Sequence, residues 1–312
     1  MIFVNVRDHA DVSGDGVHDD TRALQACLDE AKDGGTVYFP DGTYLLSGAL
    51  IFYSHQRLRL SDNAVLLRSA QSDPLTHYLL ASYSEPAWGG YSGTHDVVIS
   101  GGVFDGNAQV MEVSTLINTV HCSNILIENG RFRNCFRWHC IELNGTEKAT
   151  VRGCVFEGPS YTFVPDHLLN EMIQIDSSHY GSYGPVYDCD GKLIDFFDDG
   201  AACRDIVIEN NIFKCDGFPG IGHHGDGAHH DIDIRGNIFD GPSGRWGKSR
   251  GYIFFMPDVY NVRVYENVFL APDETQEPNV GMISQNPDKA ALKQENNTFS
   301  GCFAEYVHRG QM

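Results

Sequence analysis

The chain has 312 residues, of which 22 are Lys or Arg and 42 are Asp or Glu, so its formal net charge is −20. Nucleic acid and anionic membrane surfaces are disfavoured as partners, because both are themselves negative. A highly anionic polysaccharide would need a local basic patch, and only scattered candidates such as Arg131, Arg137 and residues 245–250 are present.

The first element expected in chain order is an α-helix over residues 20–31. Asp19, Asp20 or Thr21 can serve as its N-cap, and apolar residues between 23 and 31 recur on one stripe. Gly34 and Gly35 end the helix, and a first strand follows at residues 36–40.

No charged segment followed by an apolar one precedes this helix, so no signal peptide is recognised. We therefore expect a cytoplasmic protein, or a secreted or virion protein if the sequence was trimmed. The nine cysteines are odd in number and match no C-x-x-C zinc signature. They are expected as buried, reduced thiols rather than disulfides.

From residue 97 onward one short phrase returns along the chain. It reads apolar-x-apolar, then two or three polar or Gly residues, then an apolar residue and Phe, as in Val97–Phe104 and Ile125–Phe132. The phenylalanines stand at 104, 132, 156, 213, 239, 269 and 299, in steps of 28, 24, 57, 26, 30 and 30. A period in this range indicates stacked supersecondary units.

Each copy alternates apolar and polar residues, which is the period of a half-buried strand. Units of short strands bury their apolar faces only by stacking. The sequence thus predicts an all-β, right-handed parallel β-helix, with three strands per coil and coils about 4.8 Å apart. Residues 1–312 would form a single domain, with the helix capping the core within about residues 1–45. A two-sheet β-sandwich is the alternative.

The Asn-Asn, Gly-Asn and Asn-Gly pairs before each Phe are expected at corners between two sheets. A left-handed backbone conformation is needed there, and Asn and Gly tolerate it. The Phe after each corner would fill the same interior position, coil after coil.

Residues 11–21, the helix and residues 35–44 together resemble the N-terminal signature of the pectate lyase-like superfamily. Polygalacturonases, phage tailspike depolymerases and mannuronan epimerases share this signature. The resemblance implies the β-helix fold along nearly the whole chain and a carbohydrate substrate, although fold alone does not establish a reaction. The chain is only loosely similar to polygalacturonases of glycoside hydrolase family 28, because their Asn-Thr-Asp and Arg-Ile-Lys phrases are absent.

Four strands between the corner phrases align by their apolar residues, at 140–144, 172–176, 220–224 and 252–256. Alternation of side chains puts Glu142 and Gln174 in one outward column, and Asn144, Asp176 and His224 in the next. The Cα atoms of Glu142 and Asp176 would lie roughly 8 Å apart, which permits the carboxylate spacing of inverting glycosidases.

We therefore expect Glu142, Asp176 and His224 to be catalytic. The residues expected to bind substrate are His139, Asn144, Gln174, His179, Tyr180, Tyr183, His223 and His229. The histidine-rich run 223–231 could bind a transition metal, but it matches no strong zinc motif, and no metal ligand is assigned.

The step of 57 residues between Phe156 and Phe213 is about twice a coil. If it holds one coil, the excess lies in two loops at residues 158–171 and 177–202, and long ordered loops are usually functional. The alternative is two irregular coils, which would move Glu142 and Asp176 apart.

The sequence favours a glycoside hydrolase that acts on a polysaccharide or oligosaccharide with paired carboxylates and no cofactor. One alternative is a polysaccharide lyase or uronate epimerase, often dependent on calcium or another divalent metal, with His139, His224 or Tyr180 as base. Another is a non-catalytic glycan-binding or phage tail-type β-helix. The expected partner is a carbohydrate, and by analogy with the fold a homo-oligomer, a trimer, is expected.

Overall fold

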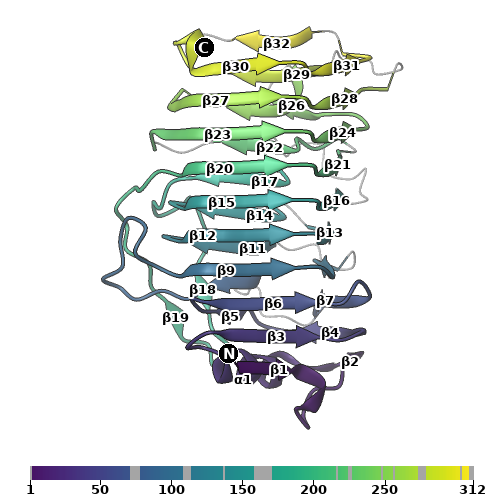
Figure 1. Ribbon diagram of the computed structural model, residues 1–312, viewed down its shortest axis with the longest axis vertical. Coiled ribbons are helices and arrows are strands. Elements are labelled where there is room, and N and C mark those ends of the chain that lie inside the picture. The colour runs from purple at the N-terminus through teal and green to yellow at the C-terminus, as the bar shows by residue number, and fades with distance from the viewer. Residues whose placement is uncertain are drawn as a thin grey trace.

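The computed structural model describes residues 2–70, 78–107, 114–135, 138–157, 171–215, 217–223, 227–246, 249–255, 257–272, 279–302 and 304–308. The described chain winds through three parallel sheets, here named A, B and C, so that each full coil adds one strand to each sheet (Figure 1). This architecture confirms the predicted right-handed parallel β-helix and rules out the β-sandwich.

The strands of sheet A, in spatial order, are β1 (Ile2–Asn5), β3 (Gly35–Phe39), β6 (Gln56–Leu60), β9 (His95–Ser100), β12 (Ser123–Glu128), β15 (Glu147–Arg152), β20 (Arg204–Glu209), β23 (His229–Arg235), β27 (Val259–Tyr265) and β30 (Leu292–Glu295). Those of sheet B are β2 (Asp15–Asp19), β4 (Gly42–Leu46), β7 (Ala64–Arg68), β10 (Val103–Asp105), β13 (Arg131–Arg133), β16 (Val155–Glu157), β21 (Ile212–Lys214), β24 (Ile238–Asp240), β28 (Val268–Leu270) and β31 (Thr298–Ser300).

The strands of sheet C are β5 (Leu50–Phe52), β8 (Tyr78–Ser82), β11 (Thr115–Val120), β14 (Ile141–Asn144), β17 (Ile173–Asp176), β22 (Ile221–His223), β26 (Ser249–Phe255), β29 (Asn279–Ser284) and β32 (Ala304–His308). Outside the coils, β25 (Gly244–Trp246) pairs with β26, and β18 (Val186–Tyr187) pairs with β19 (Leu193–Ile194), both antiparallel. Two short 3₁₀ helices are η1 (Val6–Asp8) and η2 (Lys289–Ala291).

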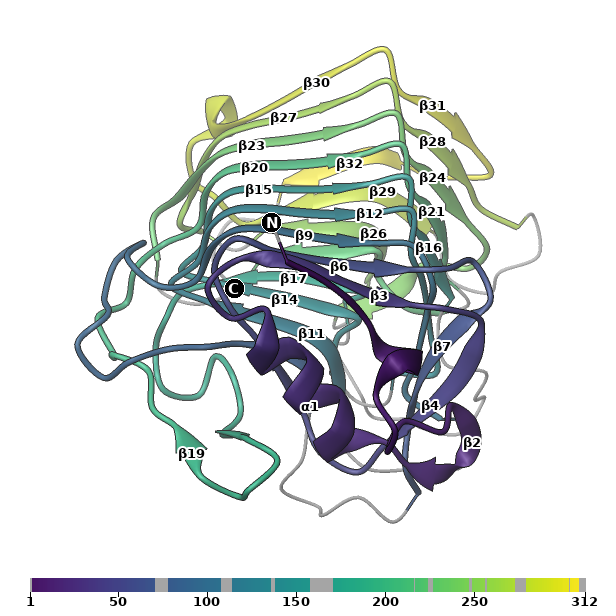
Figure 2. The same ribbon diagram turned by 60° about the horizontal axis from the view of Figure 1, so that its bottom comes forward.

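The one α-helix of the described residues, α1 (Thr21–Glu30), lies at the N-terminal end of the stack (Figure 2). Its apolar stripe, including Leu24, Cys27 and Leu28, joins the same core cluster as the coils, so it covers the end of that core as predicted. Asp20 occupies the N-cap position, but its carboxylate accepts hydrogen bonds from the backbone of Ser13 and Gly14 instead.

The corners between sheets A and B have the predicted left-handed backbone. The φ angle is 57° at Asn129, 62° at Gly153, 56° at Asn210 and 62° at Gly236. In the later coils a second asparagine follows each corner and bonds to its counterpart in the next coil, as Asn237 does with Asn267 at 2.9 Å.

The phenylalanines after these corners form one continuous stack inside the β-helix. From Phe104 to Phe299, consecutive ring centroids lie 4.8–5.0 Å apart and their planes differ by 3–11°. The predicted interior position is therefore repeated coil after coil.

The step of 57 residues holds one coil, because β15 pairs with β20 and β16 pairs with β21. The described part of its excess is residues 177–203, which we call the insertion. It leaves β17, turns back toward the N-terminal end and carries β18 and β19 (Figures 1 and 2). Asp190 of the insertion forms an ion pair with Arg22 of α1, so the insertion extends to the N-terminal helix.

The insertion covers the outer face of the early strands of sheet C. One apolar cluster there contains Ala49, Ile51, Tyr78, Ala81, Val120, Val186, Ile194 and Phe196. Strands β8, β11, β14 and β17 are buried at every residue, whereas β6 of sheet A alternates buried and exposed residues. The outward side chains of sheet C are thus shielded from solvent along several neighbouring strands, whereas those of β6 in sheet A are exposed.

All nine cysteines are free thiols, and seven of them are buried, in agreement with the expectation of reduced cysteines. Among the described residues, no helix combines the length and apolar character of a membrane-spanning segment.

Candidate functional site

The predicted alignment of sheet C strands is confirmed. β14 and β17 are neighbours, with Glu142 opposite Gln174 and Asn144 opposite Asp176. Glu142 and Asp176 are therefore one coil and two residues apart, as expected from the sequence. We call the outward side chains of this region, Asn118, Glu142, Asn144, Gln174 and Asp176 together with Glu171, the carboxylate face.

The carboxylate face is buried, which corrects the expectation that these side chains form an open surface. Glu142, Gln174 and Asp176 are each 2% exposed, and Asn144 is fully buried. The sequence pattern places a side chain on the outside of a sheet, but it does not show that another segment of the chain lies over that sheet.

Glu142 is held by neutral hydrogen-bond donors from the preceding coil. The Thr115 hydroxyl donates to Oε1 at 2.8 Å, and the Asn118 side-chain amide donates to Oε2 at 2.9 Å. Burial, and then the nearby charge of Glu142, raise the pKa of the Tyr78 hydroxyl well above its ordinary value. The position of the Glu142 carboxyl group is thus fixed from both of its oxygens.

Asp176 is held in the same way by its own strand. Its Oδ2 accepts a hydrogen bond from the Gln174 side chain at 2.8 Å, and its Oδ1 accepts one from the backbone N–H of Ser177 at 2.7 Å. Because Ser177 is the first residue of the insertion, this hydrogen bond joins the carboxylate directly to that segment.

Glu171 is a third acidic residue of the carboxylate face, and it was not predicted from the sequence. It precedes β17 and is fully buried over Gly222, where an added Cβ would lie 2.1 Å from Cγ of Glu171. His139 joins it: Nδ1 donates to the Glu171 carbonyl at 2.7 Å and lies 3.5 Å from Oε2. The one signal in the sequence was the glycine at position 222, which leaves room in an otherwise filled column.

His223 and His229, which were expected to bind substrate, lie side by side and away from solvent. Both are fully buried and pack against each other, with ring centroids 4.4 Å apart. His223 follows the inward column of Ile175, and His229 Nδ1 accepts from the backbone of Cys203 at 2.9 Å. Both side chains therefore lie inside the protein, and their expected role in substrate binding stays a prediction. His224, the third residue expected to be catalytic, lies outside the described residues.

The insertion brings His179 and Tyr180 together with an acidic residue at the surface. His179 Nδ1 lies 2.7 Å from Oδ1 of Asp198, and the Tyr180 backbone donates to the other carboxylate oxygen. Tyr180 is 72% exposed, so its ring is available to a ligand. Tyr183, by contrast, packs edge-on against Phe196 at 5.4 Å between ring centroids and helps to fold the insertion itself.

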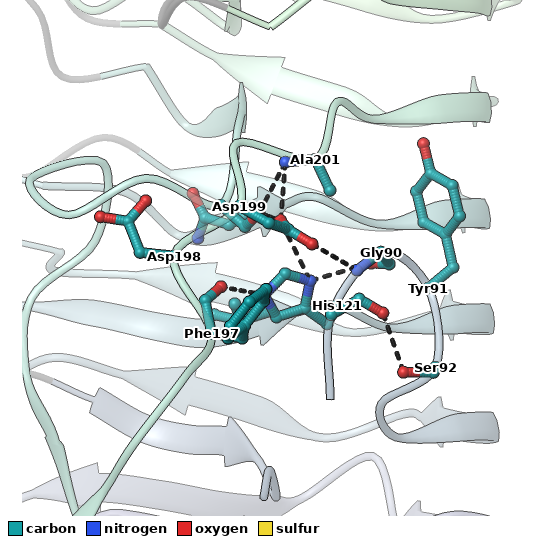
Figure 3. Close-up of polar contacts among 12 residues, drawn as sticks. Gly90, Tyr91, Ser92, His121, Phe197, Asp198, Asp199 and Ala201 are labelled. Atoms are coloured by element: carbon teal, nitrogen blue, oxygen red, sulfur yellow. Dashed lines mark hydrogen bonds and ion pairs between the residues drawn. The ribbon is translucent and has the colours of Figure 1, made fainter. Parts of the chain in front are cut away.

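His121 fastens the insertion to the segment before β9 (Figure 3). Its Nδ1 lies 2.9 Å from the carbonyl of Gly90, and its Nε2 lies 2.6 Å from the carbonyl of Phe197. A carbonyl oxygen only accepts hydrogen bonds, so both contacts are made together only when the ring carries both protons. Asp199 Oδ1, 3.9 Å from Nδ1, supplies a balancing charge.

Asp199 itself joins the two ends of the insertion to the segment that contains Gly90 (Figure 3). It accepts hydrogen bonds from the Ser178 hydroxyl at 2.7 Å and from the backbone of Gly90 at 2.7 Å and Ala201 at 2.9 Å. Burial raises the pKa of this carboxyl group, but these hydrogen bonds outweigh it and hold the pKa below its usual value. The sequence showed the Asp198-Asp199 pair, but it did not show the contact with Gly90, which is 109 positions away from Asp199.

Three comparisons relate this geometry to known proteins. Residues 3–60 match the sequence model of the family described as rhamnogalacturonase A/epimerase, pectate lyase-like. Over 234 residues the chain is 28% identical to the plasmin and fibronectin-binding protein A of Streptococcus pneumoniae, which covers 67% of this chain and 31% of that protein. The chain thus spans about a third of the length of this relative.

The fold comparison extends over the whole chain. The crystal structure of PfbA, a surface adhesin of Streptococcus pneumoniae, matches with a TM-score of 0.68 at 20% identity, over 99% of this chain and 81% of that one. The chain has the pectate lyase-like fold. A family 28 exopolygalacturonase of Yersinia enterocolitica has the same pectate lyase-like fold, with a TM-score of 0.54 at 15% identity over 99% of this chain and 76% of its own.

Proposed function

We propose that the chain is a carbohydrate-processing enzyme that cleaves glycosidic bonds at the carboxylate face. The observation that carries this proposal is the register of β14 and β17, which brings Glu142 and Asp176 onto neighbouring coils. The match of residues 3–60 to a rhamnogalacturonase A/epimerase family supports a glycan as the substrate class.

The chemistry needs two carboxyl groups with different tasks. One protonates the leaving oxygen, and the other activates a water molecule from the opposite face of the sugar. Cα atoms roughly 8 Å apart, from one interstrand spacing and two residues along a strand, leave room for that water. Thr115, Asn118 and Gln174 would keep the two carboxyl groups in place.

Access to the pair requires an opening step. Glu142 and Asp176 are each 2% exposed, so a sugar reaches them only after the covering chain moves. The insertion begins at Ser177, directly after Asp176, and is fastened at His121 and Asp199. We assign the opening movement to this segment, because it is joined to both the carboxylate face and the surface.

Kinetics on a panel of neutral and acidic glycans tests the enzyme. Glu142→Gln and Asp176→Asn should each lower turnover by at least about 10²-fold, which is typical for loss of an acid–base group. Asp233→Asn, on the outer face of sheet A, is the control and should keep full activity. Reducing ends in the product support hydrolysis, whereas ultraviolet absorbance of an unsaturated product end would show elimination instead. Full activity in both carboxylate variants, with unchanged thermal unfolding, would remove the assignment.

A second function is favoured by the burial of the carboxylates. A β-helix whose acidic pair is closed to solvent can bind a glycan on its surface without cleaving it, and the similarity to a pneumococcal adhesin supports this alternative. Binding of a glycan with no turnover, unchanged in Glu142→Gln and lost in Tyr180→Ala, would establish the binding protein and exclude the enzyme.

A further inference from the structure

We propose that His55, His95 and Asp96 form a binding site for a divalent transition-metal ion of the zinc type. One nitrogen or oxygen atom from each of these side chains lies within 4.8 Å of the others. Among the described residues, these are the His, Cys, Asp and Glu side chains that form such a group of three. The site lies at the corner through which the chain enters sheet A, and it shares no residue with the carboxylate face.

The fold brings these residues together from two neighbouring coils. Arg57 of β6 pairs with Val98 of β9, so His55 stands opposite Asp96, and His95 precedes Asp96 in the same coil. Both His55 and Asp96 have left-handed backbone, with φ of 62° and 56°. The corner therefore presents the two side chains side by side on a rigid backbone.

The spacing of the donor atoms suits a metal ion. His55 Nδ1 lies 3.3 Å from Oδ2 of Asp96. With metal–ligand bonds of about 2.0–2.1 Å in a tetrahedral site, two ligand atoms are about 3.3 Å apart. A charge-assisted hydrogen bond between the same groups would be shorter, about 2.7–2.9 Å. The His95 ring stands edge-on to that of His55, with centroids 4.8 Å apart.

Neighbouring groups orient two of the three ligands, as is usual around bound metals. His95 Nδ1 lies 3.0 Å from the carbonyl of Gly93 and 3.2 Å from the hydroxyl of Ser54. In the tautomer that carries its proton on Nδ1, this nitrogen donates to the Gly93 carbonyl and the lone pair on Nε2 is left for a metal ion. Asn124 donates to Oδ1 of Asp96, so that Oδ2 is the oxygen directed toward His55.

The same chain contains a natural comparison. His230 and Asp231 occupy the positions of His95 and Asp96 four coils further on, and Asn261 donates to Asp231 as Asn124 does to Asp96. There the histidine closes directly onto the carboxylate at 2.7 Å. The residue that makes the difference is His55, whose place in that later corner is taken by Asp205.

The donor set defines the kind of ion. Two imidazoles and one carboxylate suit zinc, cobalt or nickel, whereas calcium and magnesium prefer sites made of oxygen atoms alone. Three protein ligands leave a fourth position for water or another small ligand. An ion held by His55 and Asp96 would also join the coils of β6 and β9.

Calorimetric titration of the full chain, freed of metal with a chelator, tests the site with ZnCl₂. We expect saturable binding of one ion, at least tenfold weaker in His55→Asn, His95→Gln and Asp96→Asn. Asparagine tolerates the left-handed backbone at positions 55 and 96, so these variants keep the corner. His230→Gln is the matched control and should bind as the parent does, and CaCl₂ should not compete.

A second readout is independent of stability and of glycan turnover. CoCl₂ bound at this site should give the visible absorption of a four- or five-coordinate ion, and His95→Gln should abolish it. Absence of saturable zinc binding overturns the proposal. So does binding that persists unchanged in all three variants, which would place the ion elsewhere, for example at the histidine-rich run 223–231. Neither result bears on the carboxylate pair, which is tested by turnover.

Discussion

At the scale of single residues, hydrogen bonds between asparagines fix how one coil sits on the next. The Asn237 side chain accepts from the backbone and the side chain of Asn211, at 2.9 and 3.0 Å. It also donates to the carbonyl of Ile208 and to Asn267, both at 2.9 Å. Each asparagine thus satisfies polar groups of three coils inside the protein.

Replacement of Asn237 by Ala should therefore lower the free energy of unfolding by about 1–3 kcal/mol per buried group left unsatisfied. Equilibrium denaturation in urea measures this loss. Asn63→Ala removes an exposed asparagine whose side chain bonds to Asp41, and it should change stability by less than about 0.5 kcal/mol. Equal stability of the two variants would contradict the role assigned to the asparagine ladder.

Residue identity alone predicted the corner asparagines and the stacked phenylalanines, because each meets a requirement that recurs in every coil. It predicted that Glu142 and Asp176 share a face, because side chains alternate along strands. It missed Glu171, and it did not show that His223 and His229 are buried. The surroundings of these three side chains depend on which segments of the chain lie over the sheet, and the repeat in the sequence does not predict that.

At the scale of elements, the insertion is held by a few polar contacts at one end and by apolar packing at the other. Asp199 receives hydrogen bonds from Gly90, Ser178 and Ala201. Val186 and Ile194 pack on sheet C. The polar end lies next to the carboxylate face, so it is the end whose release would open the site.

Asp199→Ala should loosen this end without unfolding the coils. A hydrogen bond to a charged group contributes about 1.5–3 kcal/mol, so amide exchange at Gly90 and Ala201 should accelerate at least about tenfold. Hydrogen exchange read by mass spectrometry checks this. Asp195→Ala, at an exposed position of the same insertion, should leave exchange at both sites unchanged. An unaltered rate in Asp199→Ala would show that the insertion is held by its apolar end alone.

The sequence predicted that an excess of chain lies between Phe156 and Phe213, and the structure confirms one coil there. The path of the insertion was beyond prediction. Its direction depends on contacts such as Asp190 with Arg22 and Tyr78 with Gly184, which join residues more than 100 positions apart. The repeated phrase predicts where each coil lies, and the insertion does not contain that phrase.

At the scale of the whole molecule, the core holds thiols that resist ionisation. Burial raises the pKa of Cys122, Cys154 and Cys203 from 9.0 to about 12 in each case. The native state therefore keeps these protons when the unfolded chain has begun to lose them. Their contribution to stability is complete below about pH 9 and is lost as the pH rises toward 12.

The free energy of unfolding in reducing buffer should accordingly fall between about pH 9 and pH 10.5, by up to roughly 2 kcal/mol for each such thiol at about 1.4 kcal/mol per pKa unit. Cys203→Ala should make this decline less steep. Cys189→Ser, at a partly exposed position of the insertion, should leave the slope closer to that of the parent. Identical slopes in parent and Cys203→Ala would show that this thiol already ionises in the folded protein.

The uninterrupted phenylalanine stack has a practical consequence for protein engineering. Phe156 and Phe213 are 57 positions apart, yet their rings are separated by the same 4.8 Å as rings in ordinary coils. The insertion after β17 thus leaves the spacing of the stacked coils unchanged. Gly191 lies between β18 and β19, and a Cβ added there would meet no atom within 4 Å, so a foreign peptide or a small domain spliced there would be displayed on a rigid scaffold.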